Sequence, residues 1–314
     1  MLRLLLELVP CLLGGLWLGR LMPDLPETIA PALLRWGVPL SLVGLLLKGG
    51  LHNGTLQAAL FSLVLTSSGL LLTRQLPPLR RLLPAQSLQL GAVSGNTAYF
   101  GLPVAIALLP AAALSFSITY DLVGTLVTWS IGPLLLNGHR ARPEQWMRQL
   151  LVSPVCQAVV IAAPLLMSPW SSVIAALLWW PARVVLWLML LLVGMRLGLL
   201  LGRGSEPHAA LATTPLVPAL VIKLLLLPSV ALLAGTVLNW PALLRDALVL
   251  QAATPTAMSV LLLAEASQQK GRESIPAAKL VLWSTLLALI SVPLWWWVLN
   301  QPLFQPTLQD TVAM

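Results

Sequence analysis

Long apolar segments, separated by short polar stretches, recur along the whole chain. A helix needs about 20 predominantly apolar residues to cross the hydrocarbon core of a bilayer. Segments near that length lie at roughly 4–21, 30–49, 55–75, 86–109, 112–136, 149–168, 172–201, 213–238, 242–266 and 277–299. They are continuous runs without the polar–apolar alternation of barrel strands. The pattern therefore predicts an all-α polytopic membrane protein with ten transmembrane helices.

The composition agrees with this class of protein. Of the 314 residues, 58% are hydrophobic and only 9% are charged, and the mean hydropathy is +0.89. A soluble domain carries about 25% charged residues. The formal net charge of +8 does not indicate nucleic-acid binding, because the basic residues lie in short loops between apolar segments. The two cysteines and three histidines show no metal-ligand spacing, so no metal or other cofactor is expected.

The distribution of Lys and Arg predicts the orientation of the helices, because cytoplasmic loops carry an excess of these residues. One side of the membrane would hold only Arg3, Lys48 and Arg245. The loops that follow odd-numbered segments hold Arg20, Arg35, Arg74, Arg80, Arg81, Arg140, Arg142, Arg148, Arg196, Arg203, Lys270, Arg272 and Lys279. We therefore expect a multi-pass protein of the cell membrane, plasma or inner, with both termini on the non-cytoplasmic side.

The two halves of the chain resemble each other. The longest basic loop, 137–149, divides the ten segments into five and five. Three pairs of residues match at similar separations: Gly44 with Gly194, Pro10 with Pro154, and Pro103 with Pro255. Because five is odd, residues 1–137 and 138–314 are predicted to form repeats of opposite orientation, as in many secondary transporters. Leu-rich helices also resemble one another by chance, and this alternative stays open.

The fourth and ninth segments contain small and polar residues in the middle of an apolar run. The stretches are SGNTAYFGLP at 94–103 and ATPTAMS at 253–259. Non-helical backbone at membrane depth is tolerated only inside protein or beside a watery cavity. We expect both helices to break there, so that two positive half-helix N-termini converge and favour an anion, particularly a carboxylate. A simple proline kink is the alternative, and it accounts for Pro255 better than for the fourth segment.

The stretch Asn96-Thr97-Ala98-Tyr99-Phe100-Gly101-Leu102-Pro103 has the spacing Asn-x-x-aromatic-x-Gly-Leu-Pro. It resembles a motif of the auxin efflux carrier family, which includes plant PIN-type carriers and bacterial malonate-type transporters. Pro255-Thr256-Ala257 with Ala264 resembles the second motif of that family, and 223–233 resembles its eighth span. Ser259 departs from the family pattern, in which Asn often stands four residues after the proline.

The resemblance implies ten helices in two inverted five-helix repeats, with helices 4 and 9 broken and crossing at their prolines. Segments 1, 2, 6 and 7 would form a scaffold that makes a homodimer. Segments 3–5 and 8–10 would form a transport domain that moves a small organic anion by an elevator mechanism. The substrate-binding residues expected at the crossing are Asn96, Thr97, Gly101, Pro103, Thr254, Pro255, Thr256 and Ser259.

Two ionisable residues lie inside predicted helices. Asp121 in the fifth segment is a functional candidate, because an acidic group at membrane depth is costly. It can carry a coupling proton, or it can be a structural acceptor held by Thr119 or Thr125. Lys223 in the eighth segment can attract an anion, but we expect it to snorkel to the cytoplasmic surface.

Two further local features give expectations. Arg245 and Asp246 lie near the start of the ninth segment and are expected to be solvated. Trp179, Trp180 and Pro181 interrupt the seventh segment and predict a surface turn at its start.

These features favour a secondary transporter over an enzyme or a channel. The Asp-rich, Gly-x-Ser-Gly and His-cluster motifs of intramembrane enzymes do not occur in the sequence. A channel is built by symmetry around a pore, whereas inverted halves with broken helices indicate alternating access. A sodium-coupled organic-anion symporter of the bile-acid type has a similar plan and is the alternative within transport. Sodium dependence of uptake separates the two.

Overall fold

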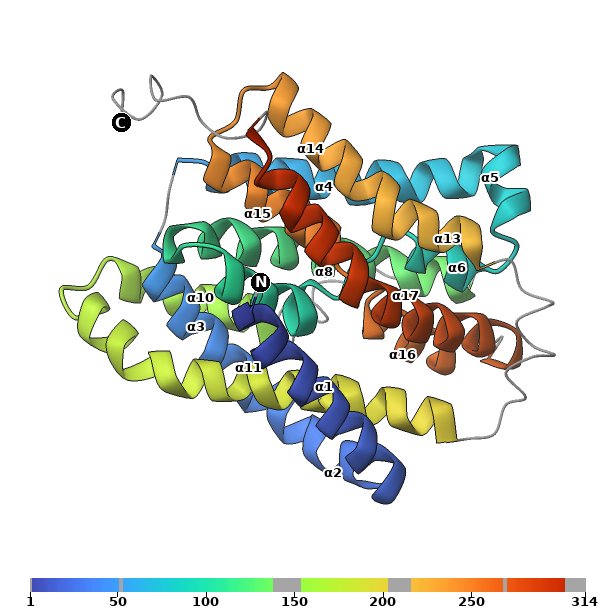
Figure 1. Ribbon diagram of the computed structural model, residues 1–314, viewed down its shortest axis with the longest axis horizontal. Coiled ribbons are helices and arrows are strands. Elements are labelled where there is room, and N and C mark those ends of the chain that lie inside the picture. Colours follow the sequence, from blue (N-terminus) through green and yellow to red (C-terminus); the bar gives the residue numbers. More distant parts are fainter. Residues whose placement is uncertain (1, 51–52, 138–153, 203–215, 268–269, 303–314) are drawn as a thin grey trace.

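The computed structural model describes residues 2–50, 53–137, 154–202, 216–267 and 270–302, and most of these residues lie in helices (Figure 1). Within these ranges the only β-type pairing is one isolated antiparallel bridge, between Gly95 and Thr256. The predicted basic loop 137–149 lies almost entirely outside the described residues.

The first half of the chain forms helices of very different lengths. They are α1 (Leu2–Leu21), α2 (Leu25–Ala32), η1 (Leu33–Gly37), α3 (Val38–Gly49), α4 (Thr55–Gln75), α5 (Pro77–Leu82), α6 (Gln86–Gly91), η2 (Thr97–Gly101), α7 (Leu102–Leu108), η3 (Ala111–Ala113) and α8 (Leu114–Asn137). The second half contains α10 (Pro154–Leu166), α11 (Ser171–Gly202), α13 (Val217–Val221), η4 (Ile222–Leu226), α14 (Leu227–Val237), α15 (Ala242–Ala252), α16 (Met258–Ala266) and α17 (Lys270–Leu299).

Among the described residues, six helical stretches are long and apolar enough to cross a membrane: Leu25–Gly49, Thr55–Gln75, Ala111–Pro133, Ser171–Leu199, Val217–Val237 and Arg272–Leu299. The predicted segments 86–109 and 242–266 instead form pairs of shorter helices with a break between them. The predicted segment 149–168 is described only from Pro154 onward, as α10. The prediction of an all-α fold with membrane-length helices is confirmed at this level.

The helix α4 shows the distribution of side chains that a lipid environment favours. Its exposed side chains include several large apolar ones, with Leu56 67% and Val64 62% exposed. Its buried side includes the hydroxyl residues Ser62, Thr66 and Thr73. The Ser62 hydroxyl donates a hydrogen bond of 2.8 Å to the backbone of the neighbouring helix α8. Apolar residues outside and small polar residues between helices are typical of packing in a bilayer.

Three spans contain a five-residue π-helical turn, and each turn ends two residues before a proline. The turns are η1, η2 and η4, and the prolines are Pro39, Pro103 and Pro228. A proline has no N–H group, and its ring clashes with the carbonyl four residues earlier. A π turn bonds five residues back instead of four, so it makes room for the ring. At Pro228 the carbonyl four residues earlier, on Leu224, accepts a hydrogen bond of 2.9 Å from the Trp295 indole.

The predicted turn at the start of the seventh segment is wrong. The helix α11 continues without interruption from Ser171 to Gly202, with Pro181 inside it. A break would expose more unsatisfied backbone than the single hydrogen bond that a proline removes. The tryptophans that suggested a turn instead cover the Arg183 guanidinium, which lies 5.9 Å from the Trp179 ring and 5.7 Å from the Trp180 ring.

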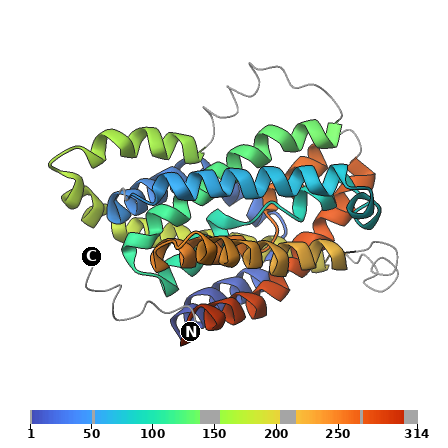
Figure 2. The ribbon, with the colours of Figure 1, turned by 90° about the horizontal axis from the view of Figure 1, so that it is seen from above.

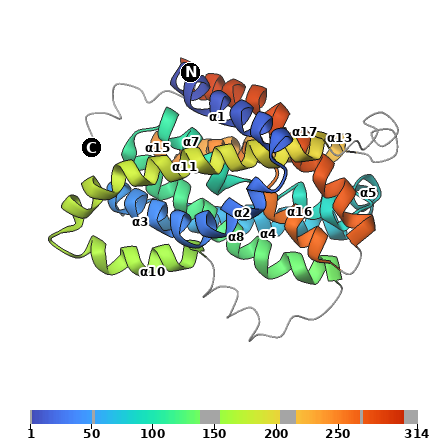
Figure 3. The same cartoon turned by 90° about the horizontal axis from the view of Figure 1, so that it is seen from below.

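The described helices pack as two groups. In the first group α11 packs along α1 and α3, and α10 packs on α3. These helices lie together in the lower left of Figure 1, and Figure 3 shows α10 next to α3. In the second group α4 packs on α8, as Figure 2 shows, while α14 packs on α15 and α16 on α17. Contacts of α1 with α7 and of α11 with η2 join the two groups.

Glycines allow α1 and α11 to approach until their backbones touch. A Cβ atom on Gly15 would lie 2.9 Å from the Cα atom of Gly194 and would also overlap the Leu191 carbonyl. A Cβ atom on Gly194 would overlap the carbonyl of Leu12 in return. Gly19 and Gly198 repeat the arrangement one turn further along. This small-xxx-small spacing on both helices is a common means of close packing in membranes.

We expect Gly15→Ala to destabilise the protein, because the new methyl group would push α1 away from α11. Overpacking of this kind costs about 1–3 kcal/mol. The measurement is the thermal unfolding temperature of the purified protein in detergent. The matched control is Gly14→Ala on the same helix, where a Cβ atom would lie 3.8 Å from the Leu191 side chain, an ordinary contact. Equal unfolding temperatures in the two variants would contradict the proposed backbone contact.

Candidate functional site

The two broken stretches lie against each other. The Asn96 N–H donates a hydrogen bond of 2.7 Å to the Pro255 carbonyl, and the Ala257 N–H donates one of 2.9 Å to the Ser94 carbonyl. Gly95 and Thr256 form the antiparallel bridge between these bonds. The expectation that the stretches 94–103 and 253–259 face each other is confirmed. We call this pairing, with the four helix ends around it, the crossing.

Each break frees backbone groups, and side chains from other parts of the protein bind several of them. The helix α6 ends at Gly91, whose carbonyl accepts a hydrogen bond of 3.0 Å from the Thr256 hydroxyl. The Thr256 N–H donates to the Ser284 hydroxyl at 3.0 Å. The Ser94 hydroxyl shares a hydrogen bond of 3.0 Å with Thr128. Each stretch therefore satisfies part of the other, as irregular backbone at membrane depth requires.

The two prolines occupy different places in this arrangement. Pro255 lies in the contact itself and accepts the Asn96 N–H. Pro103 lies in the first turn of α7, after the π turn η2. In the structure Gly95 is paired with Thr256, so the contact between the two breaks is centred on these residues.

A half-helix begins on each side of the bridge. Asn96 stands before η2, and Ala257 stands before α16; no side chain caps the first N–H groups of either helix. The Asn96 carbonyl accepts the N–H groups of Phe100 at 3.1 Å and Gly101 at 3.0 Å, which starts the π turn. Uncapped helix N-termini carry partial positive charge. The crossing therefore presents positive helix ends that lack side-chain partners among the described residues.

Asp121 connects α8 to one of these helix ends. Its carboxylate is 1% exposed, and one oxygen, Oδ1, accepts hydrogen bonds from the Thr97 hydroxyl and, at 3.4 Å, from Thr125. Thr119, one of the two local partners considered from the sequence, donates to the Ser115 carbonyl instead. The second oxygen, Oδ2, has no hydrogen-bond partner among the described residues. Asp121 thus has both a structural bond and an oxygen that remains available.

Lys223 does not snorkel to the surface. Its side chain is 1% exposed, and its Nζ atom donates a hydrogen bond of 2.7 Å to the carbonyl of Ala252, the last residue of α15. The π turn η4 places Lys223 beside the bridge, where Nζ lies 3.3 Å from the position of a Cβ atom on Gly95. The expectation of snorkelling is therefore wrong, because the carbonyl at the end of α15 binds this group inside the protein.

Gln251 is a residue of the crossing that the sequence analysis missed. It is fully buried, and neither its amide oxygen nor its amide nitrogen has a partner among the described residues. Its side chain lies against Gly101, where a Cβ atom would overlap Oε1. Buried amides are nearly always hydrogen-bonded, so this amide is available to a polar partner. A polar residue near the end of the apolar run 247–252 was the signal that could have revealed it.

The remaining predicted site residues also gather at the crossing. Asn96 and Thr97 are each 4% exposed, and the Asn96 amide makes no hydrogen bond to the described residues. The Thr254 hydroxyl is used locally, since it donates to the Gln251 carbonyl at 2.7 Å. Ser259 is half-buried in the first turn of α16. The structure therefore brings the two breaks together, while Pro103 and Ser259 lie in the first turns of the helices α7 and α16 that follow them.

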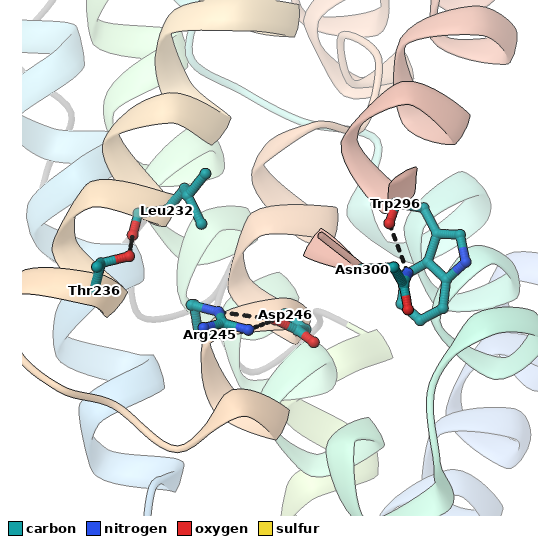
Figure 4. A network of polar contacts seen from close by, with 6 residues as sticks. All are labelled: Leu232, Thr236, Arg245, Asp246, Trp296 and Asn300. Atoms are coloured by element: carbon teal, nitrogen blue, oxygen red, sulfur yellow. Dashed lines mark hydrogen bonds and ion pairs between the residues drawn. The ribbon is translucent and has the colours of Figure 1, made fainter. Parts of the chain in front are cut away.

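The Arg245–Asp246 pair behaves differently from the expectation of full solvation. Arg245 is only 8% exposed and packs on Gly235 of α14, because a glycine there leaves room for its side chain. Its guanidinium binds Asp246 at 2.9 Å, as Figure 4 shows. The same view includes the local bonds from Thr236 to Leu232 and from Asn300 to Trp296. These contacts are helical and structural, and none involves the crossing.

No group of three His, Cys, Asp or Glu side chains lies close enough to hold a metal ion in the part of the chain that the structure describes. A scan against protein-family models gives no match to this chain, and a search of curated proteins gives none either. The geometry of the crossing is therefore the basis for any functional conclusion.

We expect Gly101→Ala to disturb the crossing, because its methyl group would overlap Gln251 and lie 2.8 Å from the Thr254 side chain. The expected loss is about 1–3 kcal/mol of stability, measured as a lower unfolding temperature. Adding Gln251→Ala to the same chain removes the overlapping amide and should restore part of this loss. Strictly additive effects of the two substitutions would contradict the contact, since neighbours that touch couple by about 0.5–3 kcal/mol.

Proposed function

We propose that this protein is a secondary membrane transporter that moves a small organic anion, in particular a carboxylate, across the membrane. The observation that supports this most directly is the crossing, where two uncapped half-helix N-termini flank a buried bridge. Broken helices that meet at membrane depth are a recurrent way to build a substrate site in transporters. The resemblance of 96–103 to the auxin efflux carrier motif points to the same class.

The chemistry of the crossing suits an anion. The first N–H groups of η2 and α16 have no capping side chain, so an anion there gains from both helix dipoles. The amide of Gln251, which has no partner among the described residues, and the amide of Asn96 add hydrogen-bond donors. A carboxylate offers acceptors only and is therefore the natural complement to these groups.

Two exchanges of contacts support the proposed inverted repeat of ten helices. The first half of the broken span 4, α6, packs on α17, and the first half of span 9, α15, packs on α8. Likewise α3 packs on α10, and α11 packs on α1. In each pair, the second contact is the first with both helices replaced by their counterparts in the other proposed repeat, as a pseudo-twofold axis in the membrane plane requires.

The division of the helices into two groups suggests how transport proceeds. In our proposal α1, α2, α3, α10 and α11 form a scaffold that makes a homodimer. The helices from α4 to α8 and from α13 to α17 form a domain that moves the crossing across the membrane in an elevator-like step. Both termini lie on the non-cytoplasmic side in this proposal, as the distribution of basic residues favours.

A screen of ligands tests the transport proposal. Purified protein is heated in the presence of monocarboxylates, dicarboxylates and aromatic acids, each with and without sodium and at several pH values. A ligand that binds the native state raises its unfolding temperature. The proposal expects selective stabilisation by at least one class of carboxylate, followed by uptake of that compound into proteoliposomes. Stabilisation by none of the three classes would contradict an organic-anion substrate.

We expect Asn96→Ala to weaken binding of the stabilising carboxylate while the protein still folds. Loss of one hydrogen bond to a charged group costs about 1.5–3 kcal/mol, or roughly ten- to a hundredfold in affinity. The measurement is the dissociation constant of the purified variant. The matched control is Asn300→Ala, which removes the same amide at the end of α17. If both variants bind the carboxylate equally well, the break in span 4 is only structural.

Asp121→Asn separates the two roles considered for this residue. If Asp121 carries a coupling proton, the variant should fold but lose the pH dependence of transport, because its amide cannot take up a proton. The measurement is the initial rate of uptake into proteoliposomes across a range of pH. Asp246→Asn, which changes the acidic partner of Arg245, should keep the normal profile. An unchanged pH profile in Asp121→Asn would leave Asp121 as a purely structural acceptor for Thr97.

A further inference from the structure

The C-terminal end of α15 is occupied by a positive charge that belongs to the protein. The Lys223 Nζ atom donates a hydrogen bond of 2.7 Å to the carbonyl of Ala252, where α15 ends. The neighbouring carbonyl of Gln251 is bound separately, by the Thr254 hydroxyl at 2.7 Å. A helix C-terminus carries partial negative charge, and its last carbonyls lack intrahelical partners. In broken transporter helices such ends are places where a coupling cation is coordinated.

The matching end in the other half of the chain is different. The helix α6 ends at Gly91, and the carbonyl of that residue accepts a hydrogen bond of 3.0 Å from the neutral Thr256 hydroxyl. The two breaks therefore have similar backbones but different groups at their negative ends. A lysine is costly to bury, so a hydroxyl would be the less expensive solution if only one hydrogen bond were needed. One hydrogen bond to the Ala252 carbonyl therefore does not explain why a charged lysine, rather than a neutral hydroxyl, stands at the end of α15.

The surroundings of the ammonium group resemble a small cation site. Lys223 is 1% exposed, and its only polar partner among the described residues is the Ala252 carbonyl. Gly95 leaves the necessary space, because a Cβ atom there would lie 2.5 Å from the Thr254 hydroxyl and 3.3 Å from Nζ. The Ala252 carbonyl thus binds Nζ, and both Nζ and the Thr254 hydroxyl lie against the open side of Gly95.

We propose that the Lys223 ammonium is a tethered replacement for a coupling cation, so that the crossing binds no sodium ion at this helix end. Shortening the side chain would open a site for a free small cation beside the Ala252 carbonyl. The inference rests on the proposed transport function only in treating the crossing as the transport site. A sodium-coupled symporter takes this positive charge from solution as a sodium ion. In this protein the Lys223 side chain provides the charge instead.

The test compares unfolding temperatures of purified protein in chloride salts of sodium, methylammonium and choline at equal ionic strength, without substrate. The wild-type protein should unfold at the same temperature in all three salts. Lys223→Ala should be less stable in choline and should gain roughly 3 °C or more in sodium or methylammonium, since a cation that binds the native state stabilises it. If this variant does not fold in choline, folded protein should be recovered when methylammonium is present throughout purification.

Lys223→Met is the matched control, because its side chain fills a similar volume but neither carries a charge nor leaves room for a cation. It should show no difference between the three salts. Selective stabilisation of the wild-type protein by sodium would overturn the inference. The inference would also be wrong if neither sodium nor methylammonium raised the unfolding temperature of Lys223→Ala or allowed folded Lys223→Ala protein to be recovered. These measurements need no substrate. If no carboxylate binds, the transport proposal is overturned, but the salt series still tests the inference about Lys223.

Discussion

The structure depends on one constraint: backbone groups that are freed inside a bilayer must find partners within the protein. Each of the two breaks supplies what the other lacks, through the bonds from Asn96 to Pro255 and from Ala257 to Ser94. Neither break could exist alone in an apolar environment without unsatisfied N–H or carbonyl groups. The same constraint accounts for the neighbouring helices. The elements α8, η4 and α17 contribute Asp121, Lys223 and Ser284, which bind groups at the ends of the two breaks.

The ends of the four half-helices are not treated alike. Their negative ends are bound, with the Ala252 carbonyl held by Lys223 and the Gly91 carbonyl held by Thr256. Their positive ends, at the starts of η2 and α16, have no capping side chain. This imbalance gives the crossing a preference in sign before any substrate is considered. In the proposed transporter an anion would complete the set of helix ends, whereas a second cation would find both of these carbonyls already bound.

The sequence was sufficient to predict the helical class and the position of both breaks, because hydropathy and the Gly, Pro and hydroxyl residues of each stretch act locally. It failed where a partner lies far along the chain. Local spacing suggested Thr119 or Thr125 for Asp121, but Thr97, from the break in span 4, also binds it. Lys223 was expected at the surface, because the sequence gives its depth but not the nearby end of α15. The turn expected at Pro181 was wrong, because a bilayer favours a continuous helix over a broken one that leaves backbone groups unsatisfied.

The π turns have a consequence for how the two halves of this chain can be compared. A π turn closes over one residue more than an α turn. In the proposed repeat, η1 lies in span 2 but span 7 has none, η4 lies in span 8 but span 3 has none, and η2 lies in span 4 but span 9 has none, within the described residues. In each of these pairs of spans, the residues that follow the π turn are therefore displaced by one position relative to their counterparts in the other span. An alignment of the two halves without gaps can therefore match the residues before the π turn or those after it, but not both. The extra residue lies in the π turn that precedes Pro39, Pro103 or Pro228, and a one-residue gap there restores the match.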